Sequence, residues 1–326
     1  MIAEEPVEVV TTQGAARRID AVDLARALAI LGMAAYHLCW DLANFRLISP
    51  IFPFTGPMRL VSHVVASTFL ALVGVSLALA HHKSLYLTAY WRRLGIVAGA
   101  AALVTVASFF FAPGLVIWFG ILHCIAAASL LALPFIKAPP LASLMAGAAA
   151  IALPFLARSP LFDPPALLWL GLGVALPNTV DWYPLLPWAG ATLMGLGVAK
   201  LPPVMKWLTS PSRWQARSTM ARGLCMAGRH SLLIYLVHQP ILTGLVAAAV
   251  WLGAPTIPEA RPDPTAFIAA CTRACVGSGR QEEDCDARCR CVRDAVERFD
   301  DVDKLGSEDS HARSRLKGIA EACTRD

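Results

Sequence analysis

The chain has 326 residues, of which 56% are hydrophobic and 16% charged, against about 25% charged for an average soluble domain. Its apolar residues fall into long blocks rather than short amphipathic ones, which is typical of a polytopic membrane protein and excludes a soluble globular main body. The net charge of +5 says little as a total. We therefore expect an all-α bundle of transmembrane helices in a lipid bilayer, with no nucleic-acid partner.

The N-terminal segment is polar and carries no visible cleavable signal peptide, because the first apolar run is too long for the apolar core of one. We expect residues 1–16 to be disordered. Arg17 and Arg18 directly precede the first apolar run, and positive charge beside a span favours a cytoplasmic N-terminus.

The first apolar run, residues 19–45, reads IDAVDLARALAILGMAAYHLCWDLANF and is long enough to cross a bilayer as one helix. Asp23 and Arg26 are three residues apart, so they share a helix face. His37 and Asp41 are four apart, so the carboxylate can fix the imidazole tautomer. Arg26 and His37 lie about 16 Å apart along a helix, near opposite membrane faces. Ionisable groups inside a span are costly, so they indicate function.

Further apolar runs predict the remaining spans, at residues 60–80, 94–111, 115–136, 141–156, 183–199 and 231–252. The stretch 158–183 contains four prolines and only about a dozen apolar residues, too few for a comfortable span. We interpret it as re-entrant or interfacial, which gives seven spans and keeps the basic loop 200–229 cytoplasmic. If it does span, the number of spans is eight.

The tail contains six of the nine cysteines. Cys271 and Cys275, like Cys285 and Cys289, are four residues apart, so each pair presents both sulfurs on one helix face. Two antiparallel helices could be joined as Cys271–Cys289 and Cys275–Cys285, one of fifteen possible pairings. Disulfides need an oxidising compartment such as the periplasm, where the last span would deliver the tail. A zinc-binding tail is the alternative, but no histidine accompanies the close cysteines.

The resulting domain organisation has four parts: an N-terminus (1–16), a transmembrane domain (17–253), a linker (254–264) and a small helical cysteine-rich tail (265–326).

Histidines on different spans are candidate catalytic residues. On this topology His37, His63 and His123 lie toward the outer leaflet, where Asp41 also lies. The same outer face carries Asp181 and Trp182, while His238 falls near mid-membrane. Polar groups beside aromatic rings suit a sugar, whose hydroxyls need hydrogen bonds and whose ring face stacks. They equally suit an ordinary aromatic belt at the membrane interface.

Arginines at the inner face are candidates for binding a phosphate-bearing donor, since Arg suits bidentate phosphate contact. The predicted donor site comprises Arg26 with its partner Asp23, and Arg92, Arg93 and Arg229. Alternatively, most of these arginines are topology signals that bind anionic lipid. The chain has no Gly-rich phosphate loop, no His-Glu-x-x-His motif and no nucleophile elbow, and we predict no metal site.

Four blocks in order carry a family resemblance: the first span, WFGILHCIAAASLLALPF, DWYPLLPWAGATLMGLG and GRHSLLIYLVHQPIL. Over roughly residues 15–252 the chain resembles the transmembrane acyltransferase superfamily, and within it the bacterial relatives of the heparan-alpha-glucosaminide N-acetyltransferase catalytic domain. The eukaryotic enzyme places its catalytic histidine in the loop after the first span. Residues 44–58 contain no histidine, so the role would fall to His37 or His63.

The resemblance implies an acyltransferase that uses cytoplasmic acyl-CoA, most simply acetyl-CoA, and an extracytoplasmic carbohydrate or amino-sugar acceptor. His37, oriented by Asp41, would be the general base or carry the acyl group, and Arg26 would hold the donor. We expect a bacterial inner-membrane protein with a cytoplasmic N-terminus and a periplasmic tail. Two alternatives remain: a solute or proton-coupled transporter using the same buried groups, and a membrane anchor for a functional tail.

Overall fold

The computed structural model describes residues 19–210, 214–257, 264–277 and 281–297, together with residues 318, 322 and 323. Every regular element in these ranges is a helix. The chain divides into two compact units, residues 1–256 and 257–326. The predicted N-terminal segment 1–16 and residues 258–263 of the predicted linker lie outside the described residues.

Four helices of the first unit are long and apolar enough to cross a membrane: α1 (Asp20–Asn44), α2 (Gly56–Ala80), α3 (Leu87–Phe111) and α10 (Ser231–Trp251). At about 1.5 Å per residue each is long enough to cross the hydrocarbon thickness of about 30 Å. Large apolar side chains point away from the bundle, such as Leu31, Leu103 and Leu245, each more than half exposed. Exposed leucines on such helices are suited to lipid, and the protein is an integral membrane protein.

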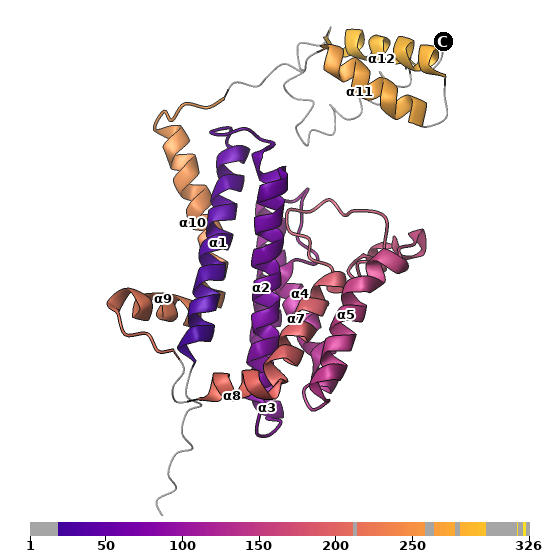
Figure 1. Ribbon diagram of the computed structural model, residues 1–326. Coiled ribbons are helices and arrows are strands. Elements are labelled where there is room, and N and C mark those ends of the chain that lie inside the picture. The colour runs from indigo at the N-terminus through magenta and orange to yellow at the C-terminus, as the bar shows by residue number, and fades with distance from the viewer. Residues whose placement is uncertain are drawn as a thin grey trace, which may run out of the picture. The chain divides into compact units, whose positions relative to one another are not determined.

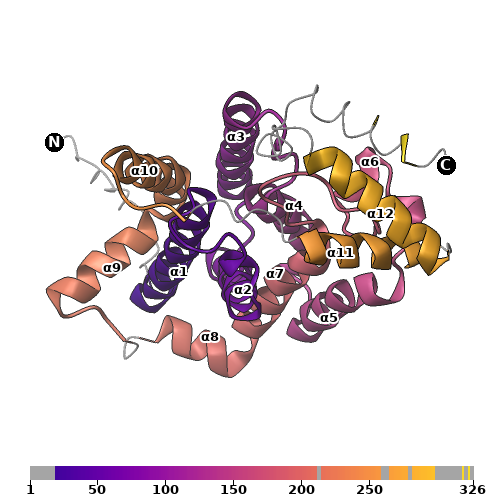
Figure 2. The same ribbon diagram turned by 90° about the horizontal axis from the view of Figure 1, so that it is seen from above.

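Three shorter apolar helices complete the bundle: α4 (Ile121–Ala132), continued by the 3-10 turn η2 (Leu133–Phe135), α5 (Pro140–Leu156) and α7 (Leu185–Lys200). Figure 2 shows α7 between α2 and α5 when the bundle is viewed along its axis. Each of these seven apolar helices overlaps one of the seven predicted spans, although α3 begins seven residues earlier and α4 six residues later than predicted. How many of them cross the membrane stays a prediction.

The segment between α5 and α7 contains no helix of spanning length. Its regular elements are a 3-10 turn, η3 (Pro160–Phe162), and a four-residue helix, α6 (Pro165–Leu168). Asp163 Oδ1 accepts hydrogen bonds from the backbone N–H groups of Val174 and Ala175, which folds the segment back on itself. Two backbone N–H groups of the segment are thus satisfied within it.

The remaining elements of this unit are short: the 3-10 turn η1 (Phe52–Phe54), α8 (Pro202–Thr209) and α9 (Thr219–Arg229). In Figure 1, α8 and α9 lie across the lower end of the bundle, close to the start of α1. They occupy most of the basic loop that the sequence assigned to the cytoplasmic side.

Helices α2 and α7 approach each other backbone to backbone. A Cβ atom on Gly74 would lie 2.0 Å from Thr192 O, and one on Gly195 would lie 2.1 Å from Ala71 O. Leu193 and Leu196 of α7 are at most 2% exposed beside this contact. Small residues that allow close backbone approach are the usual means of helix association in membranes.

The second unit is a disulfide-linked helical pair, α11 (Pro264–Gly277) and α12 (Glu282–Glu297). Its disulfides Cys271–Cys289 and Cys275–Cys285 confirm the predicted pairing. A third disulfide, Cys291–Cys323, closes a loop of sequence separation 32. Cys285 and Cys289 are at most 2% exposed, so the sulfur atoms form the buried centre of this small unit.

Because α2 and α7 are in close contact, we expect one added methyl group between them to lower the stability of the protein. Gly195→Ala should lower the free energy of unfolding by about 1–3 kcal/mol, as overpacking of a well-packed core does. Gly99→Ala on α3 is the control, because a Cβ there meets no atom within 4 Å. Thermal unfolding of both variants in detergent tests this, and equal unfolding temperatures would contradict the close contact.

Candidate functional site

A cavity of about 1820 Å³ lies in the first unit. Side chains of α1, α2, α3, α4 and α10 form most of its wall. At one end, here called the arginine end, the lining carries Asp23, Arg26, Lys83, Arg92, Arg93 and Arg229. At the other, the aromatic end, it carries Trp40, Phe54, His63, Trp182, Tyr183 and Trp188. From Arg26 to Trp40 along α1 is about 21 Å, so the cavity extends over much of a membrane thickness.

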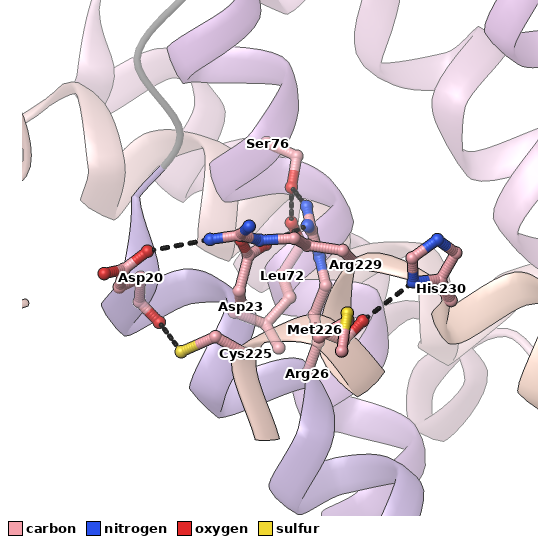
Figure 3. A network of polar contacts seen from close by, with 9 residues as sticks. All are labelled: Asp20, Asp23, Arg26, Leu72, Ser76, Cys225, Met226, Arg229 and His230. Atoms are coloured by element: carbon pink, nitrogen blue, oxygen red, sulfur yellow. Dashed lines mark hydrogen bonds and ion pairs between the residues drawn. The ribbon is translucent and has the colours of Figure 1, made fainter. Parts of the chain in front are cut away.

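A buried carboxylate organises the arginine end (Figure 3). Asp23, 4% exposed, accepts hydrogen bonds from Arg26 Nη1 at 3.1 Å and from Arg229 Nε at 2.9 Å. Arg26 also donates to Ser76 Oγ of α2, and Arg229 donates to Asp20 Oδ1 at 3.0 Å. The hydrogen bond to Asp23 and the charges of Asp23 and Asp20 raise the pKa of Arg229. The network therefore joins α1, α2 and α9.

Glycine lets α9 reach this network. A Cβ atom on Gly228 would lie 1.8 Å from Asp23 O, so the backbone of α9 rests directly on that of α1. One turn before Arg229 on α9, the thiol of Cys225 donates a hydrogen bond to the backbone oxygen of Asp20. The close approach places Arg229, the last residue of α9, against both aspartates.

The cationic side chains at the arginine end outnumber the carboxylates of Asp20 and Asp23. Arg92 and Arg93 of α3 and Lys83 line the cavity, and none has an ion pair within the described parts of the chain. Asp20 and Asp23 are already engaged by Arg26 and Arg229. An anion entering here would therefore meet cations on α3 that no described carboxylate neutralises.

Two histidines face each other farther along the cavity. His37 of α1 and His238 of α10 both line it, and their ring centroids lie 5.0 Å apart with the planes at 64°. The Nδ1 atom of His238 lies 2.7 Å from Tyr235 O, and the ring is 9% exposed. Sequence spacing had placed His238 near mid-membrane without revealing this partner, because the two residues lie 201 positions apart.

Asp41 does not make the predicted contact with His37. Its Oδ1 accepts hydrogen bonds from Gln239 Nε2 at 2.9 Å and Thr243 Oγ1 at 3.1 Å, while Oδ2 is buried without a described partner. The i,i+4 spacing permitted a contact with His37. Gln239 and Thr243 of α10 together provide two side-chain donors to Asp41, whereas a neutral histidine provides only one. Asp41 does not line the cavity.

His123 is also outside the cavity lining, and both of its ring nitrogens are engaged. Gly120 N–H donates to Nδ1 at 3.3 Å, so Nε2 carries the proton and donates to Thr105 Oγ1 at 3.2 Å. Thr105 in turn donates to Ile117 O at 2.7 Å. These contacts join His123 to α3 and to the start of α4, and its predicted catalytic role stays a prediction.

Stacked rings build the aromatic end. His63 is stacked on Trp188 at 5.5 Å between centroids, and Tyr183 meets Trp188 edge-on at 4.9 Å. Trp40 and Phe54 form a second edge-on pair at 5.2 Å. Of the predicted acceptor-binding residues, Asp181, Trp182 and His238 all line the cavity. Tyr183 and Trp188, which the sequence placed only within a family block, belong to the same surface.

Asp181 links the aromatic end to α4. Its Oδ2 accepts the backbone N–H of Ile121 at 3.1 Å, and a Cβ on Gly120 would lie 2.1 Å from the same oxygen. Glycine is therefore required beside this carboxylate. Burial raises the pKa of Asp181 to about 6, against the effect of the Ile121 hydrogen bond. Burial likewise raises the pKa of Tyr183 to about 12.

Residues 18–240 match the family model described as "Heparan-alpha-glucosaminide N-acetyltransferase, catalytic", which covers more than half of the chain. No curated protein and no solved structure matches the chain.

The raised pKa of Asp181 predicts a pH-dependent stability. Between its ordinary value of 3.8 and about 6, the folded protein binds a proton that the unfolded chain has lost, so stability falls as pH rises through this window. Asp181→Asn should flatten that part of the curve, because the amide does not titrate. Thermal unfolding from pH 4 to 8 measures it, with Glu282→Gln, an exposed site, as control. An undiminished slope in Asp181→Asn would contradict the assignment.

Proposed function

The chain belongs to the heparan-alpha-glucosaminide N-acetyltransferase catalytic-domain family, a family of membrane acetyltransferases, and from this premise we propose its reaction. It transfers an acetyl group from cytoplasmic acetyl-CoA to an extracytoplasmic carbohydrate or amino-sugar acceptor. One observation carries the proposal: a single cavity joins a cluster of cations at one end to a polar and aromatic surface at the other. Donor and acceptor can then meet between them without either crossing the bilayer.

The arginine end suits the phosphates of the donor. Arg92 and Arg93, which have no ion pair in the described structure, provide the charge, and Arg guanidinium groups match phosphate oxygens bidentately. Arg26 and Arg229, held by Asp20 and Asp23, shape the entrance. The flexible pantetheine arm of the donor would follow the cavity and carry the thioester toward His37.

His37 is the group best placed to act as general base. Its ring is partly exposed to the cavity, and no hydrogen bond of the described residues occupies its nitrogens. As base it would remove the proton of the acceptor amine or hydroxyl while that atom attacks the thioester carbonyl. The C–S bond then breaks, and the CoA thiolate leaves.

The aromatic end suits the acceptor. The rings of Trp182, Tyr183 and Trp188 offer stacking faces, and His63 and Asp181 offer hydrogen-bonding groups. A sugar ring needs both kinds of contact. We propose that Asp181 and Trp182 contact the acceptor, as their position in the cavity lining permits.

The proposed orientation places the arginine end in the cytoplasm. The basic loop that forms α8 and α9 lies at this end, as positive charge on the cytoplasmic side requires. Helix α10 begins beside Arg229 and runs toward the aromatic end, so the chain leaves the bundle there. The three disulfides of the second unit are consistent with delivery to the periplasm of a bacterial inner membrane.

Removing a donor-binding cation should weaken binding of acetyl-CoA. We expect Arg93→Ala to raise the Kd about tenfold, the loss of one charge-assisted phosphate contact, and we expect added salt to reduce the difference. Arg158→Ala is the matched control, because Arg158 follows α5 and lies outside the cavity lining. Calorimetry on detergent-purified protein measures both. Equal affinity in the two variants would contradict a donor site at the arginine end.

Removing the base should abolish transfer but spare donor binding. His37→Ala should lower kcat by about 10²–10⁴-fold with an unchanged Kd for acetyl-CoA, because the arginine end lies about 16 Å away along α1. Radiolabelled acetyl-CoA with glucosamine as the acceptor probe measures the transfer. Wild-type rates in His37→Ala would disprove the assignment. Solute flux without acetyl-CoA consumption would instead support a transporter.

A further inference from the structure

We propose that His238 is a positioning residue that receives the proton from His37, so that the two histidines form a proton relay. This inference rests on the proposed acetyl transfer and assigns His238 a role different from acceptor binding. It begins from the juxtaposition of the two rings, 5.0 Å apart between centroids, on helices α1 and α10. Both rings line the cavity between its two ends.

The hydrogen bond of His238 fixes its tautomer. Its Nδ1 lies 2.7 Å from Tyr235 O, and a carbonyl oxygen can only accept, so Nδ1 carries the proton. In a neutral imidazole the other nitrogen then has a free lone pair. That atom, Nε2, is buried and has no hydrogen-bond partner among the described residues. A buried unpartnered acceptor is costly, and such an exception in a native site is expected to have a use.

His37 supplies the missing partner during the reaction. When His37 takes a proton from the acceptor at one ring nitrogen, it can release the proton on its other nitrogen to His238 Nε2. The new bond joins the acceptor nitrogen or oxygen to the acetyl carbon, and the broken bonds are the acceptor N–H or O–H and the thioester C–S. The proton returns through the pair to the CoA thiolate, so acetylated acceptor and CoA thiol are the balanced products.

Asp41 stabilises the charged form of His238. The sequence had assigned Asp41 to His37, but its hydrogen bonds go to α10, the helix that carries His238. Its Oδ1 is held by Gln239 and Thr243, on the same helix as His238, and its Oδ2 is buried and unpartnered. The carboxylate is thus fixed beside the histidine pair, where it favours the imidazolium that forms when the proton arrives.

Other groups around the pair cannot replace His238. Tyr235 approaches it with a centroid distance of 5.6 Å, but its backbone oxygen already accepts the Nδ1 proton. Tyr36 meets His37 at 5.9 Å, and a phenol is a weak proton acceptor near neutral pH. Of the rings that neighbour His37, His238 is the one that offers a neutral lone pair.

The test compares His238→Gln with His230→Gln in the full-length protein, using acetyl-CoA and glucosamine. Gln cannot accept and pass on a proton, so His238→Gln should lower kcat about 10²-fold while the KM for glucosamine changes little. His230 is the matched control: its Nδ1 also lies beside a carbonyl, Met226 O at 2.9 Å, but its ring is exposed and outside the cavity. Its variant should keep the wild-type kcat.

Two further measurements separate a relay from a structural role. The double variant of His37→Ala and His238→Gln should be no slower than His37→Ala alone. The loss of His37 already interrupts the relay, so removing His238 as well has no further effect on kcat. In His238→Ala, added imidazole should restore kcat at unchanged KM, whereas it should not in His238→Leu, where the side chain fills the space.

The outcomes are distinguishable from failure of the proposed function. A raised KM with wild-type kcat in His238→Gln would overturn the relay and make His238 an acceptor ligand. Multiplicative losses in the double variant would also overturn it. A wild-type protein that binds acetyl-CoA but transfers nothing to any amino sugar or hydroxyl acceptor would overturn the proposed function, and the relay with it.

Discussion

The bundle depends on one buried carboxylate. Asp23 is 4% exposed and binds two arginines, one on its own helix and one from the end of α9, 206 residues later. A charge removed from water is stable when it is paired and hydrogen-bonded, and Asp23 obtains both from the two arginines. The arrangement therefore fixes where α9 and the start of α10 lie against α1, and hence where His238 lies against His37.

The same pairing determines which cations remain for a ligand. Because Asp20 and Asp23 are occupied by Arg26 and Arg229, the positive charge of Arg92 and Arg93 is left without a described ion pair. Spacing had singled out Arg26 as the donor-binding residue, because it is the arginine set inside the span. The side chain of Arg26 is held by Asp23 and Ser76, and Arg92 and Arg93 of α3 line the same end of the cavity.

Three polar groups away from the arginine end are likewise held by hydrogen bonds. His123, Asp41 and Asp181 are all tied to other helices: His123 to Thr105, Asp41 to Gln239, and Asp181 to the start of α4. A low-dielectric interior requires such partners. His37 and the Nε2 atom of His238 are the contrast, since they are near the cavity without described hydrogen bonds. Groups left unsatisfied in this way are the ones available for chemistry.

The sequence by itself determined the class and the approximate positions of the apolar helices, indicated the family through four blocks in order, and suggested two of the disulfides among fifteen possible pairings. The spans and the pairing follow from local properties: hydropathy and length define a span, and Cys-x3-Cys spacing defines a helix face. The tertiary structure decided the partners, because hydrogen bonds such as Asp41 to Gln239 and Arg229 to Asp23 join residues about 200 positions apart, and one sequence holds no record of that pairing. Helix periodicity could propose that Asp41 reaches His37, but only the packing of α10 against α1 provided the stronger donors that Asp41 binds instead.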